Sequence, residues 1–391
     1  MPNEEYTNTI PHGPLGFIAL ESCIDLGKKV DNYIVEWRNK RNSEHLSTAA
    51  FSRYQQDSFL IRSDCPRFTS GESKGTILSS IRGDDLYIMV DVTNHSMTYN
   101  MHGYENHMSP DDHYADLKRV IQAVAGQAKR ITVIMPFLYC SRQHRRTSRE
   151  SLDCAVALKE LIDMGVHSII TFDAHDPRVQ NAIPLNDFDN VMPTYQFIKA
   201  LLKNIPDIRM DADHLMIISP DEGAMSRAVY FAGMLSVDIG MFYKRRDYSK
   251  IVNGKNPIVA HEYLGRDLEG KDAIIIDDMI ASGESMLDVA RELKRRGASR
   301  IFACTTFGLF TAGFDKFDKA YEDGLIDRVI TTNLVYQSPE LLSRPYYISA
   351  DMSKYIALLI DRLNHESAIS DLLNPSERIH NILRKYGQIH D

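Results

Sequence analysis

Short runs of β-branched and other apolar residues alternate along the chain with stretches whose apolar positions repeat at helical spacing. Six runs have the length and composition of buried strands, namely Asp85–Asp91, Arg130–Pro136, Ser168–Asp173, Leu215–Ser219, Asp272–Asp277 and Arg300–Thr306. Three other stretches place their apolar residues on one face of a helix, namely Ser151–Met164, Gly223–Leu235 and Met286–Arg296. Strands that are apolar throughout are covered by helices on both faces of a parallel sheet. The pattern therefore predicts an α/β fold.

The order of these elements predicts two units of similar design. The chain has 391 residues, which is enough for two domains of ordinary size. We predict an N-terminal domain at 1–193 and a C-terminal domain at 194–391, with the last helix packing back on the first domain. Two polar segments lack a clear period: we predict a helical or flexible insertion at Lys40–Gln56 and a long loop at His95–His113.

Composition narrows the class of protein. Apolar residues make up 43% and charged residues 25%, the balance of a soluble globular protein. The five cysteines show no C-x-x-C spacing, which argues against a disulfide framework or a structural zinc site. The net charge of -8 disfavours nucleic acid as the main partner, and no apolar run reaches the ~20 residues of a membrane span. We therefore expect a cytoplasmic enzyme, or a non-catalytic relative of one.

The strongest chemical signal lies between Ala273 and Gly297. A buried strand ends in two adjacent aspartates, and a loop of mainly small residues then leads into a helix. Ligands of open α/β sheets bind at the carboxyl ends of the strands, and the N-terminus of a helix favours a phosphate. The segment therefore predicts a sugar-phosphate site, and the alternative is a solvated turn that caps a helix. The candidate residues are Asp277, Asp278, Ala281, Ser282, Gly283, Glu284 and Ser285.

Five further segments carry aromatic, basic or acidic side chains next to predicted strands or turns. They are Phe68–Glu72, Tyr139–Arg149, Phe172–His175, Ser219–Ala224 and Tyr243–Arg246. Four of them have a plain structural alternative: a packed aromatic ring, a basic loop that is solvated or binds nucleic acid, a structural histidine, and a basic strand end that faces solvent. The chain contains no G-x-x-x-x-G-K-[ST] motif, so ATP binding would require another phosphate cradle.

Taken in order from Phe68 to Asn374, these motifs resemble those of the ribose-phosphate pyrophosphokinase family. Members of that family contain two type I phosphoribosyltransferase-like domains, each a mainly parallel sheet flanked by helices. They transfer the diphosphoryl group of ATP to ribose 5-phosphate. The resemblance implies the same fold and activity here, with ATP-binding loops in the first domain and the ribose 5-phosphate loop in the second.

The resemblance also implies roles for individual residues. Phe68, Ser70 and Glu72 match the family's F-S-D-G-E segment, and Arg142 and Gln143 match its Y-A-R-Q-D-R-K loop; both contact ATP. His175 matches the D-L-H motif and Asp221 the S-P-D-x-G motif, and both belong to a magnesium site. Lys244 and Arg246 match the catalytic start of a flap, whose remainder would be Asp247–Pro257. Family members are dimers that build hexamers, so the resemblance implies a homo-oligomer.

Two departures fall inside the sugar-phosphate loop itself. The family loop reads D-D-M-I-D-T-G-G-T, whereas Ala281 replaces its third acid here and Glu284 replaces a glycine. A carboxylate that points into a phosphate pocket repels the ligand, whereas one that points outward or pairs with an arginine does not. The departures leave two alternatives open: a non-catalytic regulatory relative, or a phosphoribosyltransferase that consumes the diphosphate product.

Overall fold

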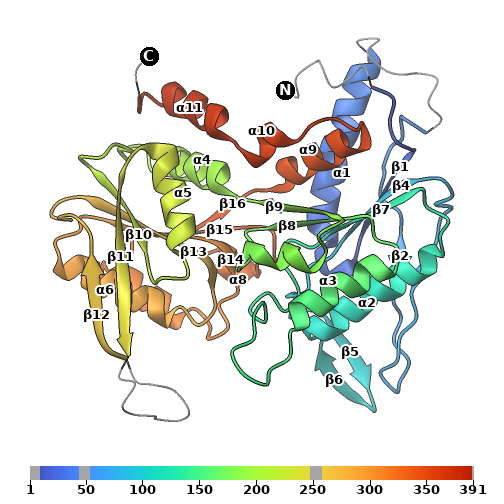
Figure 1. The fold of residues 1–391 in the computed structure, drawn as a ribbon, viewed down its shortest axis with the longest axis horizontal. Coiled ribbons are helices and arrows are strands. Elements are labelled where there is room, and N and C mark those ends of the chain that lie inside the picture. The colour runs from blue at the N-terminus through green and yellow to red at the C-terminus, as the bar shows by residue number, and fades with distance from the viewer. Residues whose placement is uncertain (1–8, 44–52, 247–257, 390–391) are drawn as a thin grey trace. The chain divides into compact units, whose positions relative to one another are not determined.

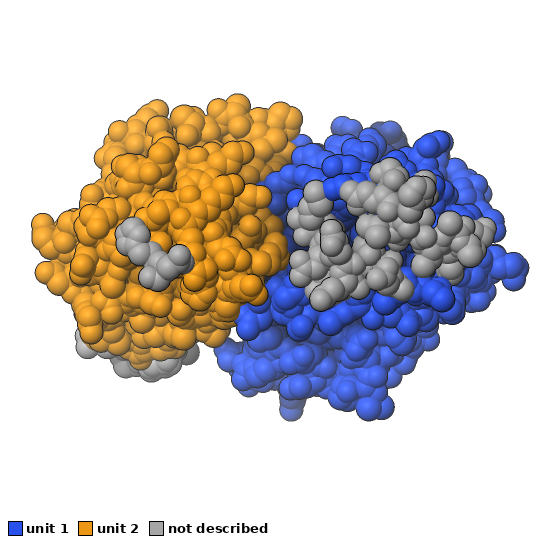
Figure 2. Space-filling model, turned by 90° about the horizontal axis from the view of Figure 1, so that it is seen from above, with its two compact units in different colours: residues 1–192, 333–336, 351–374 blue, residues 193–332, 337–350, 375–391 orange. Residues whose placement is uncertain are grey.

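The computed structural model describes residues 9–43, 53–246 and 258–389 of the chain. They form two compact units (Figure 2). The first unit contains residues 1–192, 333–336 and 351–374, and the second contains residues 193–332, 337–350 and 375–391. The C-terminal part of the chain therefore contributes to both units.

The first unit is built on a five-stranded parallel sheet (Figure 1). Its strands, in spatial order, are β1 (Leu15–Ala19), β4 (Asp85–Met89), β7 (Arg130–Ile134), β8 (Ser168–Phe172) and β9 (Asp187–Val191). Its helices are α1 (Ile24–Ser43), α2 (Pro110–Val124), α3 (Asp153–Asp163), α9 (Ser353–Asn364) and α10 (Ser370–Leu373). β1, β4 and β8 are buried at every position, as a sheet covered on both faces requires.

A buried polar network joins α1 to α9 inside the first unit. Asp361 of α9 forms ion pairs with Arg38 and Arg41 of α1, and Asn364 accepts a hydrogen bond of 2.6 Å from Arg38. The Arg38 guanidinium also lies over the ring of Tyr54, 4.6 Å from its centroid. Because only 1% of the Arg38 side chain is exposed, this network holds α9 in the first unit at a buried site. The last helix, α11 (Ser376–Lys385), packs instead on α4 (Thr194–Asn204) of the second unit.

The second unit is built on a seven-stranded sheet. In spatial order its strands are β12 (Ile258–Leu264), β11 (Asp238–Arg246), β10 (Leu215–Ser219), β13 (Asp272–Ile280), β14 (Ile301–Gly308), β15 (Arg328–Thr332) and β16 (Tyr347–Ala350). β12 is antiparallel to β11, and the other neighbours are parallel. Helices α5 (Met225–Leu235), α6 (Glu284–Arg295), α7 (Asp315–Glu322) and α8 (Pro339–Leu342) complete the unit with α4 and α11.

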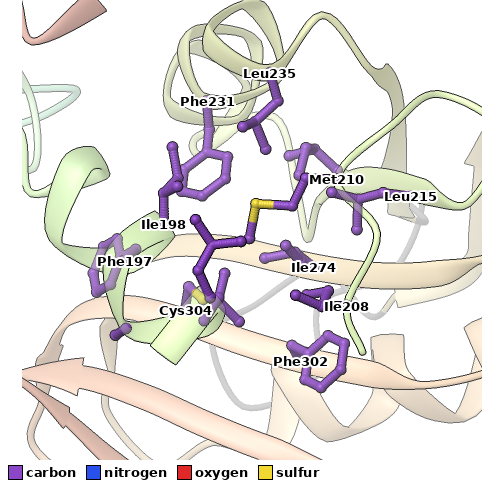
Figure 3. Packing of buried hydrophobic residues seen from close by; sticks show 14 of the residues in the cluster. Phe197, Ile198, Ile208, Met210, Leu215, Phe231, Leu235, Ile274, Phe302 and Cys304 are labelled. Carbon is purple, nitrogen blue, oxygen red and sulfur yellow. The ribbon is translucent and has the colours of Figure 1, made fainter. Parts of the chain in front are cut away.

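The two faces of this sheet carry separate apolar cores. Alternate residues of β13 enter different cores: Ile274 packs with α4 and α5, whereas Ile275 packs with α6 and α7. Figure 3 shows the first core, in which Phe231 and Leu235 of α5 lie on one side and the strand residues Ile274 and Phe302 on the other.

All six predicted strands and all three predicted helices are present, but one other prediction is wrong. The segment His95–His113 is not a loop, because it contains a hairpin of β5 (Thr98–Met101) and β6 (Tyr104–His107) followed by the start of α2. The hairpin turns at His102 and Gly103, which both have positive φ. Ser109 then caps α2 in a capping box with Asp112. Of the predicted insertion Lys40–Gln56, residues 44–52 lie outside the described residues.

Candidate active site

The segment from Phe68 to Glu72 forms a tight turn with an exposed aromatic ring at its base. The Phe68 amide donates to the Glu72 carbonyl at 2.7 Å, and the Ser70 hydroxyl donates to the Glu72 carboxylate at 2.9 Å. Gly71 has φ 92, and a Cβ there would lie 2.6 Å from the Met101 sulfur, so the turn requires glycine. Phe68 is 53% exposed although it is large and apolar. A ring presented in this way is available to stack on a flat ligand.

The basic loop after β7 presents its arginines to solvent. Arg142, Arg145, Arg146 and Arg149 are all exposed, and within the described part of the chain none of the four forms an ion pair. The start of the loop is fixed by Tyr139, whose ring stacks on Tyr114 with centroids 4.3 Å apart. The Gln143 amide donates to the Cys140 carbonyl at 2.8 Å. A rigid base with unpaired guanidinium groups above it suits a polyphosphate.

His175 lies in a strained turn at the end of β8. Asp173 has φ 42, an unusual left-handed conformation for a non-glycine residue, and its side chain is buried. The His175 ring lies 5.3 Å from the ring of His144, and His144 in turn lies 3.4 Å from Asp176. Burial lowers the pKa of His144, so its ring favours the neutral form. The structure therefore brings the basic loop and the predicted metal residue His175 together within the first unit.

Asp221 caps the turn that leads from β10 into α5. One carboxylate oxygen of Asp221 accepts hydrogen bonds from the amides of Gly223 at 2.9 Å and Ala224 at 3.3 Å. The Ser219 hydroxyl donates to the Asp221 carbonyl at 2.7 Å, which fixes the backbone of the turn. Asp221 therefore has a structural role as the cap of this turn, and this role is compatible with the metal-binding role that the resemblance implies.

The paired aspartates are strand residues rather than loop residues. β13 continues through Asp277 and Asp278 to Ile280, and the backbone amide of Asp278 donates to a carboxylate oxygen of Asp277 at 2.9 Å. Asp278 is 3% exposed and one of its oxygens lies 3.8 Å from a guanidinium nitrogen of Arg227. Burial, together with the charges of Asp278 and Asp221, raises the pKa of Asp277 well above its usual range. One aspartate is therefore beside a cation while its neighbour favours the protonated form.

The loop after β13 ends at a glycine that no other residue could replace without strain. Gly283 has φ 78 and is the residue before α6, and a Cβ there would lie 2.3 Å from the Phe317 ring. Ala281 fixes the start of the loop, because its carbonyl accepts the amide of Thr311 at 2.9 Å. Ser282 follows it, and Glu284 and Ser285 are the first two residues of α6, where helix amides have no partner within the helix.

Glu284, the residue that departs from the family pattern, is exposed at the start of α6. Its carboxylate is 64% exposed and pairs with Lys316 of α7 rather than with an arginine. The hydrogen bond from Lys316 lowers the pKa of the Glu284 carboxyl, so the group is ionised. Sequence reasoning missed both Lys316 and Arg227, because each becomes a neighbour of the loop only through the packing of a separate helix.

Lys244 and Arg246 lie on β11, which pairs with β12 up to a bulge between Arg245 and Arg246. The side chains of these two residues and the predicted lid Asp247–Pro257 lie outside the described residues. Two antiparallel strands therefore lead into and out of the predicted lid.

The carboxylates suit a cation that is shared with a ligand rather than one held by the protein alone. Among the described residues, no group of three or more His, Cys, Asp or Glu side chains could hold a metal ion. Mg²⁺ keeps several waters and commonly binds one or two carboxylates together with substrate phosphates. The charge of Asp221 raises the pKa of Asp277, so a cation near these acids would relieve their repulsion. The donor set fits Mg²⁺ in that form.

Comparisons with known proteins agree on one family. A model of the N-terminal domain of ribose phosphate pyrophosphokinase matches residues 16–165, and a model of the phosphoribosyl synthetase-associated domain matches residues 247–374. A ribose-phosphate pyrophosphokinase of Vibrio parahaemolyticus is 28% identical over 313 residues, which are 79% of this chain and 90% of that protein. The Shewanella oneidensis protein of the same name is 29% identical over 313 residues, 79% of this chain and 89% of its own length.

The fold is also similar to that of a solved structure. The phosphoribosylpyrophosphate synthetase from Mycobacterium smegmatis superposes with a TM-score of 0.71 at 19% identity, over 90% of this chain and 99% of that chain. This likeness confirms the predicted fold class of two units with parallel sheets flanked by helices. No helix in the described part of the chain has the length and hydropathy of a membrane span.

Proposed function

The chain belongs to the ribose-phosphate pyrophosphokinase family, and from that premise we propose that it is a ribose-phosphate diphosphokinase. It transfers the β,γ-diphosphoryl group of ATP to the anomeric hydroxyl of ribose 5-phosphate. The products are 5-phosphoribosyl 1-diphosphate and AMP. The observation that carries the proposal is the β13–α6 segment, in which half-buried Asp277 and buried Asp278 lead to a loop shaped by Gly283 and to a helix N-terminus.

The sugar phosphate binds to that segment. The amides at the start of α6 and around Gly283 donate to the 5-phosphate, with the positive end of the helix dipole behind them. Asp277 and Asp278 take the ribose hydroxyls. Asp278 lies beside Arg227, whereas burial and the neighbouring carboxylates raise the pKa of Asp277, so the two acids present different electrostatic surroundings to the hydroxyls.

ATP binds to loops of the first unit. The exposed ring of Phe68 stacks on the adenine. Ser70 and Glu72, which are hydrogen-bonded to each other in the same turn, also contact the nucleotide. Arg142 and Gln143 contact the nucleotide from the basic loop, where the unpaired guanidinium groups of Arg145 and Arg146 attract the phosphates. The exposure of Phe68 on a rigid turn is the structural feature that supports this assignment.

Two kinds of positive charge assist the transfer. Mg²⁺, when bound, neutralises the ATP phosphates, and His175 and Asp221 are the residues that would hold it. Lys244 and Arg246 stabilise the charge that develops on the non-bridging oxygens. The anomeric oxygen forms a bond to the β-phosphorus as the bond from that phosphorus to the α-phosphate oxygen breaks. AMP leaves with that oxygen, and the hydroxyl proton passes to solvent.

We further propose that the protein works in the cytoplasm as a dimer-based homo-oligomer, a hexamer in the family's usual assembly, with small molecules rather than nucleic acid as its partners. Size-exclusion chromatography with light scattering tests the oligomer directly. A monomer at micromolar concentration would contradict it.

An assay for AMP tests the reaction. Purified protein with ATP, Mg²⁺ and inorganic phosphate is expected to release AMP only when ribose 5-phosphate is added. The variant Asp278→Ala serves as the control, because it removes a hydroxyl contact while leaving the ATP loops of the first unit unchanged. A lack of turnover with all components present would contradict the proposal.

A second candidate is supported by Ala281 and Glu284, which replace an acid and a glycine of the family loop. On this alternative the chain is a regulatory relative that binds an active paralogue. Co-purification of an active partner together with inactivity of the isolated chain would favour it. The observed pairing of Glu284 with Lys316 weakens it, because the charge of the added carboxylate is compensated.

A further inference from the structure

The carboxylate of Glu284 occupies a position where it would oppose the proposed ligand. Glu284 is the first residue of α6, beside the amides that the proposed function assigns to the sugar phosphate. In water, two unit charges about 4 Å apart change a binding constant by about fivefold. An ionised and uncompensated Glu284 would therefore lower the affinity for a dianionic phosphate ester by roughly that factor or more.

Lys316 supplies the compensating charge from another helix. Its ammonium group donates to a carboxylate oxygen of Glu284, and both side chains are about half exposed or more, at 50% and 64%. The hydrogen bond and charge of Lys316 lower the pKa of the Glu284 carboxyl, so the two groups are a true ion pair.

The packing of α7 on the loop fixes where Lys316 lies. Phe317, the next residue, is 1% exposed and packs so closely on Gly283 that no side chain would fit there. Before α7 begins, the amide of Thr311 donates to the carbonyl of Ala281 at 2.9 Å. The start of α7 is thus attached to both ends of the loop. The position of the lysine follows from buried contacts and not only from an exposed ion pair.

We propose that Lys316 is a positioning residue of the sugar-phosphate site, which holds the Glu284 carboxylate against α7 and neutralises it. The loop thereby retains affinity for a dianionic sugar phosphate although it carries an acid. This inference rests on the proposed function, because it takes residues 281–285 to bind the 5-phosphate. It assigns Lys316 a role that depends on Glu284, so the two residues act together.

A double-mutant cycle tests this dependence in the full-length protein. The variants are Lys316→Met, Glu284→Gln and the double variant, and Lys319→Met is the matched control. Lys319 is an exposed lysine on the same helix and has no ion pair within the described residues. The dissociation constant of ribose 5-phosphate is measured by titration calorimetry without ATP, and KM and kcat are measured separately by AMP release.

Lys316→Met is expected to raise the dissociation constant and KM for ribose 5-phosphate about fivefold, with kcat nearly unchanged. The double variant should return to within about twofold of wild type, and Lys319→Met should change affinity by less than about twofold. Melting temperatures should shift by less than about 2 °C, because exposed ion pairs contribute little to stability.

Three results would overturn the inference: unchanged affinity in Lys316→Met, an equal loss in Lys319→Met, or a double variant as weak as the single one. A wild-type protein that binds no ribose 5-phosphate would overturn it together with the proposed function. If the binding cycle behaves as expected but no AMP is released, the inference stands and the proposed reaction is contradicted.

Discussion

Arg227 on α5 places a guanidinium nitrogen 3.8 Å from a carboxylate oxygen of Asp278 on β13, and the two side chains are 7% and 5% exposed. Arg227 also donates to the Gly223 carbonyl at 3.4 Å, in the turn that Asp221 caps. One arginine therefore connects the turn after β10 to the aspartate at the end of β13. Removal of one partner of a buried ion pair leaves the other charge uncompensated.

The variant Arg227→Gln is expected to reduce the free energy of unfolding by about 3 kcal/mol. It should also raise KM for ribose 5-phosphate, because Asp278 loses the buried cation beside it. Arg227→Lys keeps a positive charge, so it should reduce the free energy of unfolding and raise KM by smaller amounts. Urea unfolding and steady-state kinetics measure the two effects. If Arg227→Gln matches wild type in both measurements, the pair has no role in the site.

Substitution of Asp277 is expected to increase stability, because burial raises the pKa of its carboxyl. A raised folded-state pKa means that stability is lost as the pH rises above the usual carboxyl range, since the unfolded chain ionises there more readily. Asp277→Asn removes this cost and should increase stability at pH 7 by about 1–2 kcal/mol. It should also lower AMP release strongly. Thermal unfolding in EDTA, which excludes bound metal, checks the first effect; lower stability in the variant would contradict it.

Gly283→Ala should disturb the loop more than a comparable glycine substitution elsewhere. A Cβ at Gly283 would meet the Phe317 ring at 2.3 Å, and φ is 78. Gly270 provides the control, because its φ is 74 but a Cβ there meets nothing within 4 Å. Gly270→Ala should cost only the left-handed backbone penalty of about 1–2 kcal/mol. Gly283→Ala should cost more and weaken ribose 5-phosphate binding as well, which calorimetry can measure. Equal effects of the two variants would contradict the packing argument.

The network around Asp361 predicts how the first unit responds to acid. Burial opposes ionisation, but hydrogen bonds and charges from Arg41 and Arg38 lower the pKa of Asp361 to about 2. Because this lies below the unfolded value of 3.8, the stabilisation is present above about pH 4 and is lost as the pH falls towards 2. The shift corresponds to about 2 kcal/mol. Tyr54 and His365 also face this group, and burial lowers the pKa of His365.

Hydrogen exchange of the α1 and α9 amides between pH 5 and pH 2.5, corrected for intrinsic rates, measures this loss. Asp361→Asn should weaken the protection of the α1 and α9 amides at every pH and make that protection less dependent on pH. Asp163→Asn is the control, because Asp163 pairs with Lys159 on the surface with 62% of its side chain exposed. It should change protection little. Protection of α9 that is the same at both ends of the pH range would contradict the account.

The sequence allowed the strands and most motif positions to be predicted, because buried parallel strands read as continuous apolar runs. The length of β13 was not predictable in the same way. Asp277 and Asp278 look like turn residues in isolation, yet pairing of Asp277 with Thr305 and of Met279 with Phe307 on β14 keeps them in the strand. This changes the site, because both acids are held by the strand and Asp278 lies beside Arg227.

The hairpin at β5 and β6 was missed because its strands are polar and exposed. Only the His102–Gly103 pair indicated a turn in this segment. In the structure both of these residues have positive φ. The charge partners Arg227, Lys316 and Asp361 were missed for another reason. Each is an ordinary surface-type residue on an amphipathic helix, and tertiary packing alone brings it to its partner.

The central claim is that the β13–α6 loop binds the acceptor sugar of a diphosphoryl transfer. Position-labelled ATP tests it most directly, with ³²P in the β-phosphate, ribose 5-phosphate, Mg²⁺ and the purified protein. The account predicts that label moves to a product of ribose 5-phosphate in equal amount to the AMP formed, and that Asp278→Ala abolishes the transfer. Release of labelled ADP in place of AMP, or hydrolysis of ATP that does not depend on ribose 5-phosphate, would contradict it.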